Sequence, residues 1–374
     1  MESLPRQIGI AVCGCGYWGI NYVRVFHQSP EARIVAICDL EVDRLRQIGR
    51  QFPGVNLYSD VERVLRRPDV DAVVVCTPVT THYALARRCL EAGKHVLIEK
   101  PITAQETEAE ALIELAETKN LVLMVGHTFL YNAGVHKVKS YIEQGQIGRL
   151  YYLYSRRTNL GPIRHDVNAL WDLAPHDISI FNFLLNSTPI WVSAVGGRVL
   201  QTACEDFGFI SLGYENDVVG HIHVSWTDPN KVREVVVVGS DQRIVFDDVK
   251  TTEQVRVYEK GVTLPEVTVP SYGEYRFLIR DGDIISPKVE VSEPLKNQCR
   301  HFLESVVQGS RPLTDGWAGL QVVGVMKAVD RSVKLNGAPV LVRETMALTS
   351  NPEIAASVWE VSDGAALTAT EVAV

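Results

Sequence analysis

Short apolar runs alternate with helical patterns along the first 125 residues of the chain. The runs IGIAV, RIVAIC, DAVVVC, HVLIE and LVLMV are rich in β-branched residues and carry almost no polar position. Strands buried on both faces of a parallel sheet have this composition. Between the runs lie helical patterns such as THYALARRCLEAG. The alternation predicts a doubly wound α/β domain with a parallel sheet.

The pattern changes after about residue 126. Strand-like segments such as GRLYYLYSRR, FGFISLGY, VVGHIHVSW and VREVVVVGS follow one another from residue 149 onward, with short connections between them. Successive strands joined by short turns favour a mostly antiparallel sheet. Three helical patterns accompany these strands, at about residues 172–186, 291–309 and 315–336.

Two domains and a tail are therefore expected in this chain of 374 residues, which is long enough for two separate cores. Residues 1–125 are predicted to form the doubly wound domain. Residues 126–348 are predicted to form an α+β domain, whose large and mostly antiparallel open sheet carries helices on one face. Residues 349–374 show no firm periodicity and are expected to form a C-terminal arm or tail.

Composition narrows the class of protein. Apolar residues make up 46% of the chain and charged residues 22%, as in soluble globular enzymes. The net charge of −8 and the lack of Lys/Arg-rich runs argue against nucleic acid or an anionic membrane surface as a partner. No apolar stretch approaches the roughly 20 residues of a membrane span, and the start MESLPRQIGIAV lacks the pattern of a signal peptide. We therefore expect a cytoplasmic protein.

The seven cysteines are dispersed, and none of them forms a C-x-x-C pair. Cys13, Cys38 and Cys76 each end an apolar, strand-like run, which is typical of buried, reduced thiols. The HIH stretch at 221–223 places two histidines on one strand face but lacks a third ligand at convincing spacing. No metal site is expected.

Gly14, Gly16 and Gly19 form a G-x-G-x-x-G pattern directly after the run IGIAV and before a helical segment. The first glycine permits a tight turn, the second lets the backbone approach a pyrophosphate, and the third lets helix and strand pack closely. The start of the helix then offers free N–H groups to the phosphates. The pattern predicts a dinucleotide-binding Rossmann domain; the alternative is a glycine turn in a fold without its cofactor.

Asp39 closes the second apolar run, twenty residues after Gly19. A carboxylate at this place binds the hydroxyl groups of the adenosine ribose and repels a 2′-phosphate. The next basic residue along the chain is Arg44. NAD is therefore favoured over NADP as the cofactor.

Two more strand ends bring polar residues to the same edge of the predicted sheet. Thr77 and Pro78 follow the run DAVVVC, and Lys100 follows HVLIE, beside the expected path of the nicotinamide. A lysine there is suited to anchor a hydroxyl group or to act as a general acid or base. The alternative is a solvated surface lysine.

Asp172 and His176 are four residues apart, so a helix places them on one face. Pro175 fits only the first turn of a helix, which puts Asp172 at the entry to it. A carboxylate and an imidazole in this arrangement can cooperate near neutral pH. The alternative is an ordinary capped helix start.

The motifs GCGYWG, CTP…H, EKP and DLAPHD occur in this order and together resemble the glucose–fructose oxidoreductase / inositol dehydrogenase (Gfo/Idh/MocA) family. The resemblance covers roughly residues 6–345. It implies that Lys100 holds the reacting sugar hydroxyl and that His176 is the catalytic acid/base. It also implies that Asp172 binds the sugar or orients the site.

The same resemblance implies further contacts to the cofactor. Glu99 and Pro101 would shape the nicotinamide pocket, the proline through a cis peptide bond. The matching motifs also contain Tyr17, Trp18 and His82, which are predicted to line the cofactor site.

The segment SRRTNLGPIRHDVN departs from the family's pattern, as does NALW, which stands where many relatives carry two glycines. Arg156, Arg157 and Arg164 suit phosphate or carboxylate groups, and the chain thus resembles the branch that acts on nucleotide-linked sugars at C3. The alternative is a polar surface loop. The predicted substrate contacts are Asn159, Arg164 and Asn168.

These features predict an NAD-dependent enzyme that transfers a hydride between nicotinamide and a ring carbon, C3, of a small-molecule sugar or nucleotide-sugar substrate. The alternatives are an inositol or free-sugar dehydrogenase, a glycoside hydrolase of the same fold that retains its NAD, and a binding module without chemistry. The resemblance also implies a homodimer or homotetramer.

Overall fold

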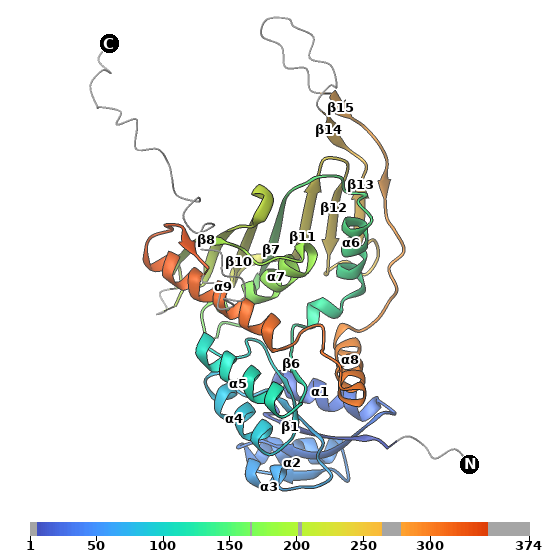
Figure 1. Cartoon of the computed structure of the whole chain (residues 1–374), viewed down its shortest axis with the longest axis vertical. Coiled ribbons are helices and arrows are strands. Elements are labelled where there is room, and N and C mark those ends of the chain that lie inside the picture. The colour runs from blue at the N-terminus through green and yellow to red at the C-terminus, as the bar shows by residue number, and fades with distance from the viewer. Residues whose placement is uncertain (1–5, 165–166, 201–203, 264–277, 343–374) are drawn as a thin grey trace, which may run out of the picture. The chain divides into compact units, whose positions relative to one another are not determined.

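The structure is a computed structural model, and it describes residues 6–342 apart from 165–166, 201–203 and 264–277. Two large sheets organise the described chain (Figure 1). The predicted tail over residues 349–374 lies outside the described residues. Within them, no helix is long and apolar enough to cross a membrane.

The first sheet is parallel throughout and has the strand order β3-β2-β1-β4-β5-β6. Its central strands are buried on both faces, which explains their uninterrupted apolar runs. The order reverses between β1 and β4, and ligands of such sheets bind at the carboxyl ends of the strands beside this point. The strands are β1 (Ile8–Cys13), β2 (Ala32–Cys38), β3 (Asn56–Tyr58), β4 (Ala72–Val75), β5 (His95–Ile98) and β6 (Leu123–Val125). The helices between them are α1 (Tyr17–Gln28), α2 (Val42–Gln51), α3 (Val61–Leu65), α4 (Val79–Glu91) and α5 (Glu106–Thr118).

In the described residues, the second sheet has nine strands in the order β16-β13-β12-β11-β7-β10-β9-β8-β17. β10 runs parallel to β7, and the other paired neighbours are antiparallel. The predicted fold class, a parallel doubly wound sheet followed by a mostly antiparallel open sheet, is confirmed. The strands are β7 (Leu150–Leu160), β8 (Trp191–Gly197), β9 (Phe207–Gly213), β10 (Val219–Ser225), β11 (Thr227–Gly239), β12 (Arg243–Asp247), β13 (Val255–Tyr258), β16 (Ile284–Ile285) and β17 (Val340–Leu341). A separate antiparallel pair consists of β14 (Gly261–Thr263) and β15 (Leu278–Arg280).

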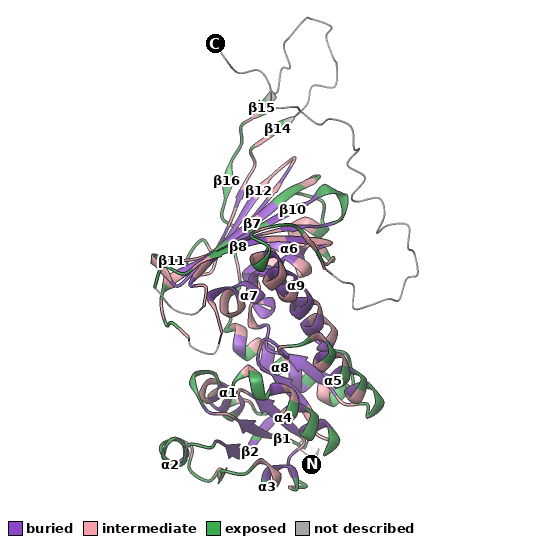
Figure 2. Cartoon of the chain, turned by 90° about the vertical axis from the view of Figure 1, so that its left-hand side faces the viewer, coloured by how far each residue is buried: buried purple, intermediate pink, exposed green. Residues whose placement is uncertain are grey.

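Helices α6, α7 and α9 cover one face of the second sheet (Figure 1). Alternate residues of the strands, such as Ile210 and Ile222, are buried beneath these helices, and buried residues gather where helices and sheet meet (Figure 2). The strands therefore show the alternating pattern of a sheet that is covered on one side. The remaining helices and turns are η1 (Thr128–Tyr131), α6 (Ala133–Glu143), α7 (Ala169–Leu185), η2 (Glu215–Asp217), α8 (Pro294–Gln308) and α9 (Gly316–Lys334).

Helix α8 belongs to the second half of the chain but packs against the first sheet's helix α1. The rings of Phe302 and Phe26 meet at 6.5 Å, and both side chains are fully buried. The Val125 amide of β6 donates to the Thr314 carbonyl at 2.7 Å, just before α9, and Leu320 of α9 joins the core of the first sheet. The chain thus leaves the first sheet after β6 and later returns to it.

Candidate active site

The turn between β1 and α1 requires two of its glycines for internal reasons. Gly14 has a φ of +84°, and a Cβ there would lie 2.8 Å from backbone atoms of Cys76. A Cβ on Gly19 would lie 1.9 Å from the Gly14 carbonyl oxygen. The segment after β4 therefore leaves no room for a side chain at Gly14, and the close packing of α1 against the turn leaves none at Gly19.

Gly16 is different, because a Cβ there would meet no atom of the described chain within 4 Å. It is the N-cap of α1, and no described side chain caps this helix. Its surroundings open into a cleft of about 1700 Å³. Because uncapped N–H groups and the helix dipole favour an anion, this space fits the pyrophosphate of a dinucleotide.

Asp39 lies in the same cleft, at the carboxyl end of β2. Its Oδ2 accepts a hydrogen bond from the Cys15 amide at 2.6 Å, and its Oδ1 accepts one from the Glu41 amide at 2.9 Å. Arg44 Nη1 lies 3.1 Å from both oxygens. Burial opposes ionisation of Asp39, but these donors together hold its pKa below the ordinary value. The carboxylate is thus ionised and already paired with a cation.

The cleft extends from the glycine turn to α7 and brings most of the predicted site residues together. Its described lining does not include Gly19, which supports the turn, or Asn168. The amide of Asn168 caps α7 by accepting from Trp171 N at 2.9 Å, and it donates to Glu205 Oε2 at 2.9 Å. The predicted residues in the lining are Gly14, Gly16, Tyr17, Trp18, Asp39, Thr77, Pro78, His82, Glu99, Lys100, Pro101, Asn159, Arg164, Asp172 and His176.

Lys100 follows β5 and has a side chain that is only 7% exposed. Its Nζ donates to the backbone carbonyl of Asp172 at 2.7 Å and lies 3.4 Å from Asp172 Oδ1. Burial lowers the pKa of Lys100, against the opposing charges of Asp172 and Glu99. The peptide bond to Pro101 is cis, as the resemblance implied. Lys100 is therefore a buried cation in the cleft and not a solvated surface lysine.

Helix α7 presents Asp172 and His176 on one face, one turn apart. Pro175 lies in the interior of this helix, so the expectation of a first-turn proline is wrong. A proline there lacks the N–H that would reach the Trp171 carbonyl, which loosens the helix at this turn. The next carbonyl, that of Asp172, accepts the hydrogen bond from Lys100.

The Asp172 carboxylate joins several elements of the cleft. Besides Lys100, its Oδ1 accepts from Arg164 Nη1 at 3.0 Å, and its Oδ2 accepts from Trp226 Nε1 at 3.3 Å. Asp172 thus ties together β5, α7 and the segment after β7. It fixes the position of the lysine ammonium.

His176 faces the cleft one turn beyond Asp172. Its Nδ1 is buried without a hydrogen-bond partner among the described residues, and its ring meets that of Phe129 edge-on at 5.0 Å. Burial, followed by the positive charges of Lys100 and Arg157, lowers the pKa of His176 well below 6.5. The imidazole is therefore neutral near pH 7 and able to accept a proton.

A buried network behind Lys100 was not predicted from the sequence. Tyr22 donates to Glu99 Oε1 at 2.8 Å, and Gln298 Nε2 donates to the Tyr22 oxygen at 2.7 Å. The Lys100 amide lies 3.2 Å from Glu99 Oε2. These residues come from α1, α8 and the end of β5, so no local spacing in the sequence connects them.

His127 is a second unpredicted residue near the lysine. It follows β6 and is 1% exposed, and neither ring nitrogen has a hydrogen-bond partner in the described chain. Burial, assisted by the charge of Lys100, lowers its pKa to about 3. The strand-end rule that pointed to Lys100 applies equally to this residue.

His82 joins two loops at the edge of the first sheet. Its ring nitrogens lie 2.8 Å from the carbonyl oxygens of Pro101 and Thr77. Burial lowers the pKa of this histidine. Its contacts hold the cis-proline segment against the start of α4.

Two of the three arginines predicted to bind anions, Arg156 and Arg157, lie on opposite faces of the second sheet. Arg157 is buried and forms two hydrogen bonds to Asp177, at 2.8 and 3.0 Å, and its guanidinium lies 4.3 Å from the centre of the Phe129 ring. Arg156 is exposed on the opposite face of the sheet, because successive residues of a strand alternate. Asn159 lines the cleft and donates to the Gly161 carbonyl.

The described part of the chain holds no cluster of side chains that suits metal binding or thiol chemistry. There, no group of three or more His, Cys, Asp or Glu residues is placed to hold a metal ion. His221 and His223 lie on β10, where both stack on Phe209. Five cysteines are buried free thiols, namely Cys13, Cys15, Cys38, Cys89 and Cys299.

The fold and the glycine turn are those of a dinucleotide-dependent oxidoreductase. Matches to two family models identify the family. Residues 8–127 match an oxidoreductase family with an NAD-binding Rossmann fold, and residues 135–245 match the GFO/IDH/MocA C-terminal domain. The chain therefore belongs to the GFO/IDH/MocA family of NAD-dependent oxidoreductases. The resemblance stated from the motifs is confirmed, as is the expected cofactor.

Individual relatives act on sugars and polyols. UDP-N-acetylglucosamine 3-dehydrogenase from Acidithiobacillus ferrooxidans is 26% identical over 85% of this chain and 96% of its own. Myo-inositol 2-dehydrogenase from Thermotoga maritima is 26% identical over 87% of this chain and 96% of its own. The WlbA dehydrogenase from Bordetella pertussis, solved in complex with NADH and UDP-GlcNAcA, shares the fold, with a TM-score of 0.73 at 22% identity over 90% of this chain and 99% of its own.

Proposed function

We propose that this oxidoreductase transfers a hydride between NAD and C3 of a nucleotide-linked sugar. The observation that carries the proposal is the cluster of Lys100, Asp172 and His176, which lines the same cleft as the glycine turn. The similarity to UDP-N-acetylglucosamine 3-dehydrogenase, which extends over nearly the whole of that relative, supports the choice of substrate class.

The proposed catalytic roles follow from charge and burial. Lys100 binds the oxygen of the reacting hydroxyl, and its positive charge stabilises the negative charge that develops on this oxygen as the proton leaves. His176 is neutral and takes this proton during oxidation, or returns it during reduction. Asp172 holds the lysine in place through its carbonyl and its carboxylate.

The cofactor supplies the hydride acceptor or donor when it is bound. Gly14 and Gly16 admit its pyrophosphate, and Asp39 binds the adenosine ribose at the end of β2. Glu99 and the cis-linked Pro101 form the wall of the nicotinamide pocket. The other proposed cofactor contacts are Tyr17, Trp18, Thr77, Pro78 and His82. As a cofactor contact, Gly19 stays a prediction without support from the geometry, since it supports the turn from outside the described lining.

Asn159 and Arg164 are the proposed contacts to the substrate, because both line the cleft beside Asp172. Asn168 stays a prediction without support from the geometry, since its amide is engaged in capping α7.

The test is NADH formation by the purified protein with NAD and a panel of UDP- and TDP-hexoses, beside free glucose and inositol. We expect turnover with one of the nucleotide sugars. Turnover with free polyols alone would contradict the proposed substrate and favour an inositol dehydrogenase, which the similarity to myo-inositol 2-dehydrogenase makes the second candidate. Tightly retained NAD without net NADH would instead favour the glycoside hydrolase.

The proposed assembly is a homodimer or homotetramer formed through the face of the second sheet that the helices leave bare. Tyr152, Phe209 and Val219 are exposed there, on three neighbouring strands. Exposed apolar side chains on one sheet face favour an interface. The expected result is a mass above that of one chain by light scattering, and a monomer at all concentrations would contradict it.

A further inference from the structure

Most cationic side chains that line the cleft are neutralised by a nearby carboxylate. Lys100 and Arg164 both contact Asp172, and Arg157 is paired with Asp177. On the nucleotide side, the pairs are Arg24–Glu293, Arg44–Asp39 and Arg88–Glu62. Because carboxylates of the protein neutralise these cations, they are expected to bind a further anion only weakly.

Lys231 is an exception. Its side chain is exposed in the lining of the cleft and makes no hydrogen bond or ion pair with the rest of the described chain. The pairing of β11 with β7 shifts register between Thr227 and Val232, so the strand bulges here. The Thr158 hydroxyl holds the bulge by donating to the Asn230 carbonyl at 2.7 Å. Such bulges redirect a side chain, and this one presents Lys231 to the cleft.

Arg233 lies two residues further along β11, on the same face as Lys231, and also lines the cleft. Its register partner on β7 is Arg157, so two arginines occupy directly opposed positions of the sheet. Like charges on directly opposed residues destabilise a sheet. Arg157 is offset by Asp177, whereas the Arg233 guanidinium has, among the described residues, a single long contact of 3.5 Å to Asp248 Oδ2.

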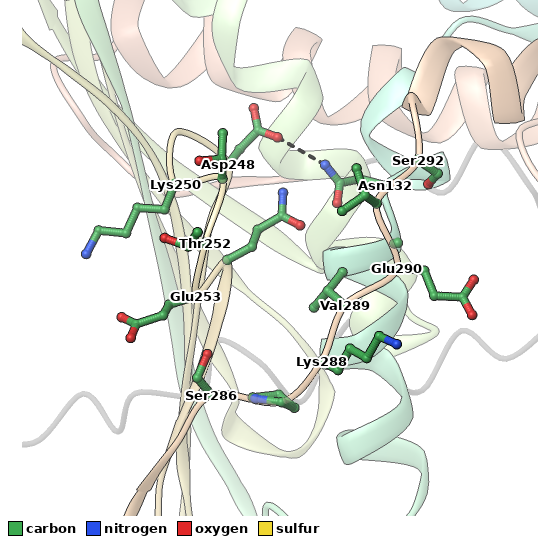
Figure 3. Close-up of a pocket in the computed structure, with 15 residues that line it drawn as sticks. Asn132, Asp248, Lys250, Thr252, Glu253, Ser286, Lys288, Val289, Glu290 and Ser292 are labelled. Atoms are coloured by element: carbon green, nitrogen blue, oxygen red, sulfur yellow. Dashed lines mark hydrogen bonds between the residues drawn. The ribbon is translucent and has the colours of Figure 1, made fainter.

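Asp248 is itself held in place by Asn132. Its Oδ1 accepts a hydrogen bond from Asn132 Nδ2 at 3.0 Å, at the edge of a second cavity of about 400 Å³ (Figure 3). The Asn132 Oδ1 in turn accepts from the Gly134 amide at 2.8 Å, at the start of α6. This series of contacts anchors Arg233 at one nitrogen and leaves most of its N–H donors for the cleft.

We propose that Lys231 and Arg233 form a subsite for an anionic group of the substrate, on the β11 wall of the cleft. The proposal rests on the proposed function and names its substrate class: a sugar that carries a phosphate or a carboxylate apart from the reacting carbon. Burial lowers the pKa of His176 most, and Arg233 is among the charges that add to this effect, so the subsite lies within electrostatic reach of the reacting groups.

The test compares Lys231→Met and Arg233→Gln with Lys250→Met and Arg300→Gln, which remove exposed cations outside the cleft lining. kcat and KM are measured with NAD and UDP-N-acetylglucosamine, glucuronate or free N-acetylglucosamine. We expect each β11 variant to raise KM for a charged substrate by about 10- to 100-fold with little change in kcat. The neutral sugar and the control variants should show no such rise. A rise confined to the UDP-sugar assigns the subsite to phosphate, and one confined to glucuronate assigns it to carboxylate.

A binding measurement separates the subsite from the proposed reaction. UDP and glucuronate are titrated into NADH-loaded protein, and the nicotinamide fluorescence is followed. Binding that is lost in both β11 variants supports the subsite even where no sugar is oxidised. Nucleotide-sugar turnover with the same KM in wild type and both variants overturns the subsite while the proposed function stands. Equal binding of both probes by all variants overturns it as well.

Discussion

The phenolic hydroxyl of Tyr22 donates a hydrogen bond of 2.8 Å to Glu99 Oε1 in a buried site. Because the same oxygen accepts a hydrogen bond from Gln298 at 2.7 Å, its single hydrogen is directed at the carboxylate. Burial raises the pKa of Glu99, while this hydrogen bond and the charge of Lys100 act in the opposite direction. The network therefore favours an ionised carboxylate beside the lysine.

Replacing Tyr22→Phe removes that donor and should raise the pKa of Glu99 further. As pH falls, the carboxylate is then neutralised earlier, and the acidic limb of the kcat/KM profile moves to higher pH. Gln298→Leu should shift the limb in the same direction by a smaller amount, since it acts through the phenol. A lower melting temperature with an unmoved limb would mean that the two residues are merely structural.

Lys100→Met should lower kcat by about 10²- to 10⁴-fold, because the reacting oxygen loses the charge that stabilises it. The dissociation constant for NADH, measured by fluorescence, should stay nearly unchanged, since the lysine contacts Asp172 and not the glycine turn. Lys119→Met, at an exposed position after α5, is the matched control and should retain full turnover. Loss of NADH binding by the Lys100 variant would show a structural role instead.

His127 should make the protein less stable as the pH falls. Burial and Lys100 lower its pKa from 6.5 to about 3, so the unfolded chain binds a proton that the folded chain excludes between these values. The stability that comes from keeping His127 neutral is fully retained above about pH 6.5, and the free energy of unfolding declines as the pH falls below this value. In His127→Asn, the decline in the free energy of unfolding should be shallower by up to about 1.4 kcal/mol per pH unit.

Urea unfolding at several pH values measures this slope. His27→Asn is the matched control, because His27 is exposed on α1. We expect the control to keep the slope of the wild type. The same slope in the His127 variant would rule out His127 as its source.

Asp39→Asn should weaken the preference for NAD over NADP. The variant keeps the shape of the side chain but loses the negative charge that repels a 2′-phosphate, while Arg44 stays beside it. We expect the ratio of kcat/KM for the two cofactors to fall about 10-fold or more. Arg44→Ala should change the ratio in the opposite direction. An unchanged ratio in both variants would place cofactor selection elsewhere.

Local patterns predicted the first sheet and its glycine turn because each depends on residues close in sequence. The β-branched runs became β1, β2, β4, β5 and β6, and the spacing of Gly14 and Gly19 reflects contacts within one turn. The motifs also identified Lys100, Asp172 and His176, which line one cleft. The boundary at residue 126 stays a prediction.

Long-range contacts account for what the sequence did not reveal. Gln298 reaches Tyr22 from a helix near the other end of the chain, and the parallel placement of β10 beside β7 depends on the whole second sheet. The opposite orientations of Arg156 and Arg157 are a different case. Because successive residues of a strand point to opposite faces, the sequence already predicts that Arg156 and Arg157 point apart. Grouping them as one anion site overlooked this alternation.

The return of α8 to the first sheet affects how the chain matures on the ribosome. Phe26 emerges early, but its partner Phe302 is translated only after every described strand of the second sheet except β17 has been made. At a translation rate of about 5–20 residues per second, the apolar face of α1 stays without its packing partner α8 for roughly 15–55 s. During that interval the nascent nucleotide-binding domain offers molecular chaperones an uncovered aromatic surface. A message truncated before α8 would yield a product that keeps this surface permanently.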